Sequence, residues 1–121
     1  MTGKVVVYHY SKCKKSRAGL EYLRNLGVDP LVVNYIEDGL DHEQLKELLC
    51  KLNLPAFEMV RQQEEYYKET LKHQDISEDQ WIDILIENPR LLRRPIVIFN
   101  DGAVVADPPQ NADKLLTAYI K

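Results

Sequence analysis

The sequence of 121 residues predicts an α/β fold with a four-stranded mixed sheet. A β-branched run, an amphipathic helical pattern and a second β-branched run open the chain with short connections, which predicts a parallel β-α-β unit. Near the other end, two apolar runs flank a turn sequence and predict a β-hairpin, followed by a last helix. A long helical segment lies between the two parts. The expected order is therefore β-α-β, a helical insert, then β-β-α.

The β-α-β unit begins with "KVVVY" at Lys4–Tyr8, which predicts a buried strand. The second strand is expected over Leu31–Ile36, with the sequence "LVVNYI". Gly27 is expected to end the helix between them, because glycine tolerates the left-handed conformation that commonly follows a helix. The apolar residues of this helix recur at helical spacing: Leu20, Tyr22, Leu23 and Leu26.

A helical insertion is expected at about residues 41–90, within a single domain that spans residues 1–121. Two capping-box pairs predict helix starts, since in each an N-cap residue is followed three positions later by glutamine. The pairs are Asp41 with Gln44, and Ser77 with Gln80. A stripe of apolar residues follows each pair, so both helices are expected to bury one face.

The hairpin is expected from Ile96–Phe99 and Ala103–Ala106, which Asn100-Asp101-Gly102 separates. The Asp-Gly step is expected to supply the positive φ of a tight turn. Asn111 is expected to cap the last helix. The complete order of elements is the thioredoxin-like arrangement, in which a cysteine opens the first helix.

Composition excludes several classes of protein. The formal net charge of −3 argues against a nucleic-acid binder. No apolar run is as long as a membrane span and the N-terminus lacks the apolar core of a signal peptide, so we expect a cytoplasmic protein. The two cysteines, Cys13 and Cys50, are too few for a disulfide scaffold and are expected to be reduced. Cysteine and histidine spacings match no usual zinc motif, so no metal site is expected.

Cys13 is the principal candidate for chemistry. It lies where the first strand leads into the first helix, among four cations: Lys12, Lys14, Lys15 and Arg17. The thiolate is the nucleophilic form of cysteine, and both a helix N-terminus and nearby cations favour it. The alternative is a structural cysteine buried in a tight joint. We favour the nucleophile, because these cations would be costly around an inert apolar thiol.

Three segments together resemble the glutaredoxin-dependent arsenate reductase family, which includes the Spx regulators. They are "YHYSKCKKSR", "VRQQEEYY" and "RRPIVIF", and the similarity extends from about Val5 to the last helix. The matched positions are His9, Cys13, Ser16-Arg17, Arg61 and Arg94-Pro95. The resemblance implies a nucleophilic Cys13. We expect His9, Ser16 and Arg17 to tune or orient its thiol: Arg17, and His9 when protonated, add positive potential, and the Ser16 hydroxyl can donate a hydrogen bond to the sulfur.

The resemblance also implies how the substrate is held and reduced. Arg61 and Arg94 would bind a small oxyanion, arsenate in the family, because a guanidinium presents a planar set of donors. From sequence alone both are equally compatible with solvated surface arginines. Pro95 would be cis and face the active sulfur. No bound cofactor is implied; glutathione or another low-molecular-weight thiol would be the co-substrate and a glutaredoxin the partner.

Asp107 departs from the family pattern, which has a third arginine at this place. A carboxylate there repels an arsenate dianion, so a thiol reductase with another substrate remains an alternative. A further alternative is an Spx-like regulator of RNA polymerase. It is disfavoured because Ser16 replaces the second cysteine of the Cys-x-x-Cys switch. Cys50 is expected to be partly exposed, and a disulfide between it and Cys13 is the alternative to resolution by an external thiol.

Overall fold

The computed structural model describes the backbone of residues 4–120 and the side chains of residues 4–117. It contains the predicted four-stranded mixed sheet, with strand order β2-β1-β3-β4. The strands are β1 (Val5–Tyr8), β2 (Leu31–Val33), β3 (Ile96–Phe99) and β4 (Gly102–Val105). β1 pairs in parallel with β2 and antiparallel with β3, and β3 and β4 form the antiparallel hairpin.

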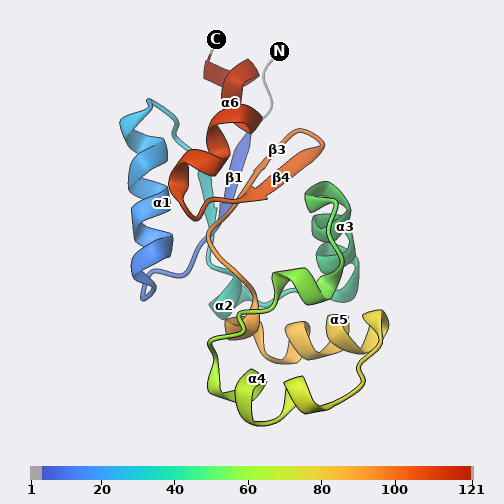
Figure 1. Cartoon of the computed structure of the whole chain (residues 1–121). Coiled ribbons are helices and arrows are strands. Elements are labelled where there is room, and N and C mark those ends of the chain that lie inside the picture. Colours follow the sequence, from blue (N-terminus) through green and yellow to red (C-terminus); the bar gives the residue numbers. More distant parts are fainter. Residues whose placement is uncertain (1–3, 121) are drawn as a thin grey trace. The chain divides into compact units, whose positions relative to one another are not determined.

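The chain divides into two compact units, one formed by the segments up to Asp38 and from Arg94 onward, the other by Gly39–Arg93. The first holds the sheet, and the expected insertion at about residues 41–90 falls within the second. Helices of the first unit are α1 (Lys14–Asn25), α2 (Tyr35–Asp38), the 3-10 helix η4 (Pro109–Ala112) and α6 (Asp113–Ile120) (Figure 1). Those of the second are α3 (His42–Leu52), η1 (Ala56–Met59), α4 (Glu65–Glu69), η2 (Leu71–His73), α5 (Glu78–Glu87) and η3 (Pro89–Leu91).

The core of the sheet-bearing unit lies between one face of the sheet and the helices α1 and α6. Alternate residues of β1 and β3 point to this face, because successive side chains of a strand point to opposite sides. Leu23 of α1 and Leu116 of α6 pack against them. Gly102 lies close to α6: a Cβ there would lie 2.7 Å from Cδ1 of Leu115, whose side chain would have to shift. The strand residues of this core are Val5, Val7, Val97 and Phe99.

The end of α1 follows the predicted pattern. Gly27 adopts a φ of +87° directly after the C-cap residue Leu26. The N–H of Gly27 donates to the carbonyl of Arg24, and the N–H of Val28 donates to the carbonyl of Leu23. These two bonds form a Schellman motif, which satisfies carbonyls that the helix itself leaves without partners. The prediction for Gly27 is confirmed.

The helical unit begins its two longest helices at the predicted capping boxes. In each, the side chain of the N-cap residue, Asp41 or Ser77, accepts the backbone N–H of a glutamine, whose own side chain accepts the N–H of the cap. Each helix then buries an apolar stripe, as the sequence pattern predicted. The buried residues are Leu45, Leu48, Leu49 and Leu52 in α3, and Trp81, Ile82 and Leu85 in α5. Among residues 4–120 no helix is long and apolar enough to cross a membrane.

The predicted end of the second strand and the predicted turn of the hairpin were both wrong in detail. The second strand ends at Val33 rather than Ile36, because Asn34 begins a helical turn: its carbonyl accepts the N–H of Asp38. In the hairpin, the positive φ belongs to Asn100, at +55°, whereas Gly102 already pairs with Phe99 as the first residue of β4. The two-residue loop is therefore Asn100-Asp101.

The predicted cap of the last helix was also wrong. Asn111 lies inside η4, which runs directly into α6. Its side-chain amide donates to the carbonyls of Val105 and Asp107, each at 3.2 Å. Asn111 therefore fixes the connection after β4 rather than opening a helix.

Candidate active site

Cys13 occupies the N-cap position of α1, with the extended backbone conformation that an N-cap requires. Its carbonyl accepts the N–H of Arg17 at 3.0 Å, the first hydrogen bond of the helix. Its own N–H donates to the carbonyl of Tyr10, also at 3.0 Å. Residues 10–13 thus form a tight turn between β1 and α1. The thiol is half-buried and not in a disulfide.

Arg17 stabilises this turn. Its Nη1 donates to the carbonyl of Ser11 at 2.8 Å, so its side chain reaches back over the loop from the first turn of α1. This hydrogen bond is made to the turn and not to the thiol, so the role of Arg17 in tuning or orienting Cys13 stays a prediction. The position of the sulfur depends on that turn.

His9 and Ser16 form a buried pair behind the turn. The Nδ1 of His9 lies 2.7 Å from Oγ of Ser16, and this Oγ also accepts the N–H of Tyr10 at 3.0 Å. Burial lowers the pKa of His9, and the charges of Arg24 and Arg17 lower it further against the opposing hydrogen bond with Ser16. The lowered pKa disfavours the protonated form of His9 and so argues against a positive charge from this residue. Its role in tuning or orienting the thiol stays a prediction.

The thiol of Cys13 has a lowered pKa. Burial raises the pKa, but this effect is outweighed by a hydrogen bond from Arg94, the backbone N–H groups of Ser16 and Lys15, and the charge of Arg94. The side chain of Cys13 makes no capping hydrogen bond. The N–H groups of Ser16 and Lys15 therefore act on the sulfur as dipoles at the N-terminus of the helix. The Ser16 hydroxyl contacts His9 instead of the sulfur, so Ser16 acts on the thiol through its backbone.

Arg94 and Pro95 lie immediately before β3. The Arg94 residue is 7% exposed, and its guanidinium carbon lies over the ring of Tyr10, 5.2 Å from the ring centre. The Arg94–Pro95 peptide bond is cis, as the resemblance implied. Gly19 of α1 allows this segment to approach closely, because a Cβ there would lie 2.5 Å from Cγ of Pro95. The close approach places the start of β3 against the helix that Cys13 opens.

Arg61 belongs to the helical unit. Its Nη1 donates to Oε2 of Glu64 at 2.8 Å, and the side chain is 16% exposed. Its backbone N–H donates to the carbonyl of Leu91 at 2.7 Å. The guanidinium is thus largely buried and paired with a carboxylate. Its role in holding an oxyanion stays a prediction.

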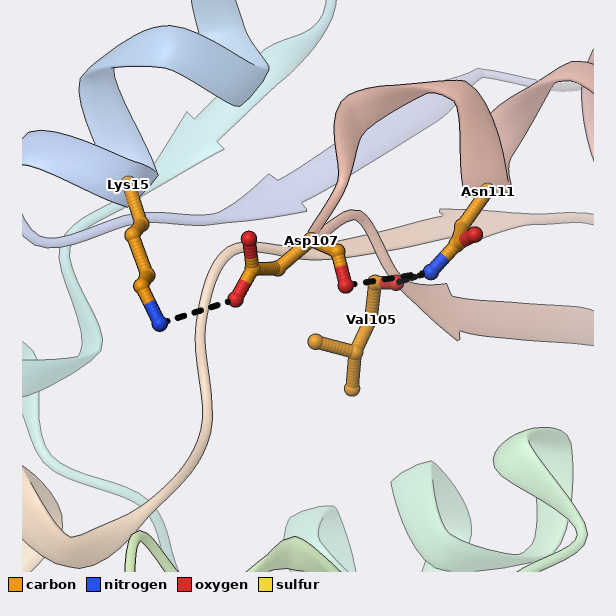
Figure 2. Close-up of polar contacts among 4 residues, drawn as sticks. All are labelled: Lys15, Val105, Asp107 and Asn111. Atoms are coloured by element: carbon orange, nitrogen blue, oxygen red, sulfur yellow. Dashed lines mark hydrogen bonds and ion pairs between the residues drawn. The ribbon is translucent and has the colours of Figure 1, made fainter. Parts of the chain in front are cut away.

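Asp107 is paired with a cation of the first turn of α1. Its Oδ2 lies 3.2 Å from Nζ of Lys15, and Asn111 holds its backbone carbonyl, as Figure 2 shows. Both side chains of the ion pair are solvent-accessible. Because Lys15 offsets the charge of Asp107, this carboxylate repels an anion less than an unpaired aspartate would.

Cys50 is exposed on α3, in the helical unit. The expectation that it would be at least partly exposed is confirmed. That an external thiol, and not a disulfide with Cys50, resolves the intermediate on Cys13 stays a prediction. Among the described residues, 4–120, no group of three metal-binding side chains is arranged to hold an ion.

Several residues of the site were missed from the sequence. Tyr10 was not singled out, although an aromatic residue three positions before the cysteine was a visible signal. Glu64 was overlooked as the partner of Arg61, although a carboxylate three residues away on a helical turn commonly forms such a pair. The four cations around Cys13 were interpreted together, whereas Arg17 binds the turn and Lys15 binds Asp107.

The arrangement suits nucleophilic attack on an electrophile that carries negative charge. A thiol whose pKa is lowered at a helix N-terminus is of the kind that can act as a nucleophile. The guanidinium of Arg94, which lowers that pKa, is of the kind that can donate hydrogen bonds to an oxyanion.

Comparison with known proteins finds a matching family and similar proteins that align over most of the chain. The model of the ArsC family matches residues 8–115. A protein of Escherichia coli K12 named "Uncharacterized protein YfgD" is 41% identical over 112 residues, which cover 91% of this chain and 94% of that protein. A Neisseria meningitidis serogroup A protein named arsenate reductase is 33% identical over 93% of this chain and 98% of its own length. The solved structure of an arsenate reductase from Vibrio cholerae superposes with a TM-score of 0.87 at 37% identity, covering 94% of this chain and 98% of that one.

Proposed function

Because this chain belongs to the ArsC family, we propose that it is a thiol-dependent, arsenate-reductase-like oxidoreductase whose nucleophile is Cys13. One observation carries this proposal: Cys13 caps α1 with a lowered pKa, and the largest stabilising influence on its thiolate is the buried Arg94. Relatives named arsenate reductase that align over almost their whole length support the substrate class.

In the first step the thiolate of Cys13 attacks As(V) of arsenate. A sulfur–arsenic bond forms, and one arsenate oxygen leaves as water after protonation. Arg94 donates to the oxyanion as the sulfur gives up its negative charge, so that the guanidinium stabilises charge both before and after attack. Arg61 supplies a second guanidinium, which must exchange Glu64 for the substrate.

In the second step a low-molecular-weight thiol such as glutathione reduces the adduct. Its thiolate attacks the sulfur of Cys13 and forms a mixed disulfide. The electron pair of the sulfur–arsenic bond remains on arsenic, which leaves as arsenite. A glutaredoxin then removes glutathione by thiol–disulfide exchange and returns the Cys13 thiolate. Each arsenate thus oxidises two thiols to one disulfide, and no bound cofactor is needed.

This reaction requires a compartment in which thiols are kept reduced, so we place the protein in the cytoplasm. Its partners in this scheme are the oxyanion substrate, the small thiol and the glutaredoxin. Neither a nucleic acid nor a membrane takes part.

The test is arsenate-dependent consumption of glutathione in the presence of glutaredoxin. Cys13→Ser should abolish it, whereas the matched control Cys50→Ser should retain it. Full activity of Cys13→Ser would overturn the nucleophile. If arsenate gives no turnover while the thiol of Cys13 remains reactive, the substrate is another electrophile, as the carboxylate of Asp107 would favour.

A further inference from the structure

Tyr10 is held firmly at the active site although it belongs to no helix or strand. Its backbone N–H donates to Oγ of Ser16, and its carbonyl accepts the N–H of Cys13, both at 3.0 Å. Two hydrogen bonds therefore fix the backbone of Tyr10 relative to the turn that carries the thiol. The half-buried ring extends from a backbone that is anchored on both sides.

The ring of Tyr10 lies against the buried guanidinium that acts on the thiol. The guanidinium carbon of Arg94 is 5.2 Å from the ring centre, within the range of a cation–π interaction. Such contacts strengthen when the cation is removed from water, and the Arg94 residue is only 7% exposed. The flat ring therefore limits where the guanidinium can lie.

A ring differs from a carboxylate as a partner for an active-site arginine. A carboxylate would fix the guanidinium but would also bring a negative charge that competes with the thiolate and the oxyanion. An aromatic face attracts the cation through its quadrupole and brings no net charge. Tyr10 therefore can hold Arg94 in place while its positive charge continues to act on Cys13.

We propose that Tyr10 is the positioning residue of this site, with its carbonyl setting the turn of Cys13 and its ring setting the guanidinium of Arg94. Tyr10 thereby fixes the position of the Cys13 thiol relative to the guanidinium of Arg94. The part that concerns the thiol rests on these contacts of Tyr10 and on the direction in which Arg94 shifts the pKa of Cys13. The part that concerns turnover rests on the proposed function.

The test compares Tyr10→Phe, which keeps the ring, with Tyr10→Leu, which keeps apolar bulk without a π face. All variants carry Cys50→Ser, so that Cys13 is the only thiol. The rate of alkylation is measured against pH with neutral iodoacetamide and with anionic iodoacetate. The ratio of the two rates reports the positive charge at the sulfur, a property that a merely structural residue would not alter.

We expect Tyr10→Phe to match the parent chain. Tyr10→Leu should shift the alkylation midpoint to higher pH and lower the iodoacetate-to-iodoacetamide ratio about three- to tenfold, the scale of a partly desolvated cation–π contact. In an Arg94→Ala background, Tyr10→Leu should have no further effect on the ratio, because the cation that the ring holds is gone. Tyr10→Met is the second ringless variant if the leucine variant does not fold.

Three results would overturn the proposal: an unchanged ratio in the ringless variants, an equal loss in Tyr10→Phe, or a full additional loss in the Arg94→Ala background. The alkylation readout needs no substrate. Absence of arsenate turnover would therefore count against the proposed function and leave the positioning role of Tyr10 to be decided by the ratio.

Discussion

The two arginines that were predicted from the sequence to bind an oxyanion lie in different units and have different partners. Arg94, in the sheet-bearing unit, contacts the face of Tyr10 and acts on the thiol of Cys13. Arg61, in the helical unit, forms an ion pair with Glu64 at 2.8 Å. Both are largely buried. The difference teaches that burial of an arginine does not decide its availability, because the charge of the neighbouring group does.

This contrast assigns the two residues different tasks. Arg94 lowers the pKa of the Cys13 thiol, and the ring of Tyr10 brings no net charge that would oppose this effect. Arg61 must release the carboxylate of Glu64 before it can bind an anion. Its contribution to the binding free energy of the anion is therefore only the difference between its interaction with the anion and its interaction with Glu64. We therefore expect the region around Cys13 to govern reactivity and the region around Arg61 to govern substrate affinity.

Removing Arg94 should give the largest effect. Arg94→Ala deletes a charge-assisted hydrogen bond to the sulfur, and such bonds contribute about 1.5–3 kcal/mol. We expect kcat/KM for arsenate to fall about ten- to a hundredfold, at roughly 1.4 kcal/mol for each factor of ten. Steady-state kinetics at pH 7 measures it.

The matched control is Arg93→Ala, at the neighbouring arginine, whose Nη1 donates to the carbonyl of Glu58. It removes the same charge from the adjacent position. If both variants lost activity equally, the special role of Arg94 would be refuted.

Releasing Arg61 from its carboxylate should give a smaller and opposite effect. Glu64→Gln removes the competing charge, so KM for arsenate should fall about 1.4- to fivefold, which corresponds to the ~0.2–1 kcal/mol of an ion pair with access to solvent. Glu65→Gln, at an exposed neighbour, is the control and should leave KM unchanged. In an Arg61→Ala background, Glu64→Gln should have no benefit; a benefit that persisted there would show that Glu64 acts through another group.

The Lys15–Asp107 pair should give the smallest effect, because both side chains are accessible to solvent, at 56% and 36%. Asp107→Asn should change the free energy of unfolding by less than about 1 kcal/mol. It should also speed alkylation of Cys13 by iodoacetate slightly, since Lys15 is then unpaired beside the helix N-terminus. Asp101→Asn, the same charge change in the hairpin loop, is the control. A large loss of stability in Asp107→Asn alone would mean that the pair is structural.

Local signals made most of the fold predictable. Capping boxes at Asp41 and Ser77 and the terminal glycine of α1 were predicted correctly, because each depends on residues three or four positions apart. The second strand was overextended past Asn34, where one side chain and one carbonyl begin a helical turn that competes with strand pairing. Strand propensity alone does not reveal that competition.

The candidate site was predictable in its residues and less so in its contacts. Cys13 and the dipole of its helix follow from neighbouring sequence. The contact between Tyr10 and Arg94 joins positions 84 apart, the difference between 94 and 10, and depends on how β1 and β3 pair. His9 was expected to add positive potential when protonated, but the burial that lowers its pKa is a property of packing and not of sequence spacing.

Whether the folded protein stabilises the thiolate of Cys13 is tested most directly by measuring the rate of its alkylation by iodoacetamide against pH. The measurement uses the Cys50→Ser variant, folded and then unfolded in urea. The rate follows the thiolate fraction and rises with pH through the pKa, so a lowered pKa moves the midpoint to lower pH. We predict a midpoint for the folded chain clearly below that of the unfolded chain, whose thiol should titrate near the ordinary value of about 8.5. A folded midpoint equal to or above the unfolded one would contradict the account.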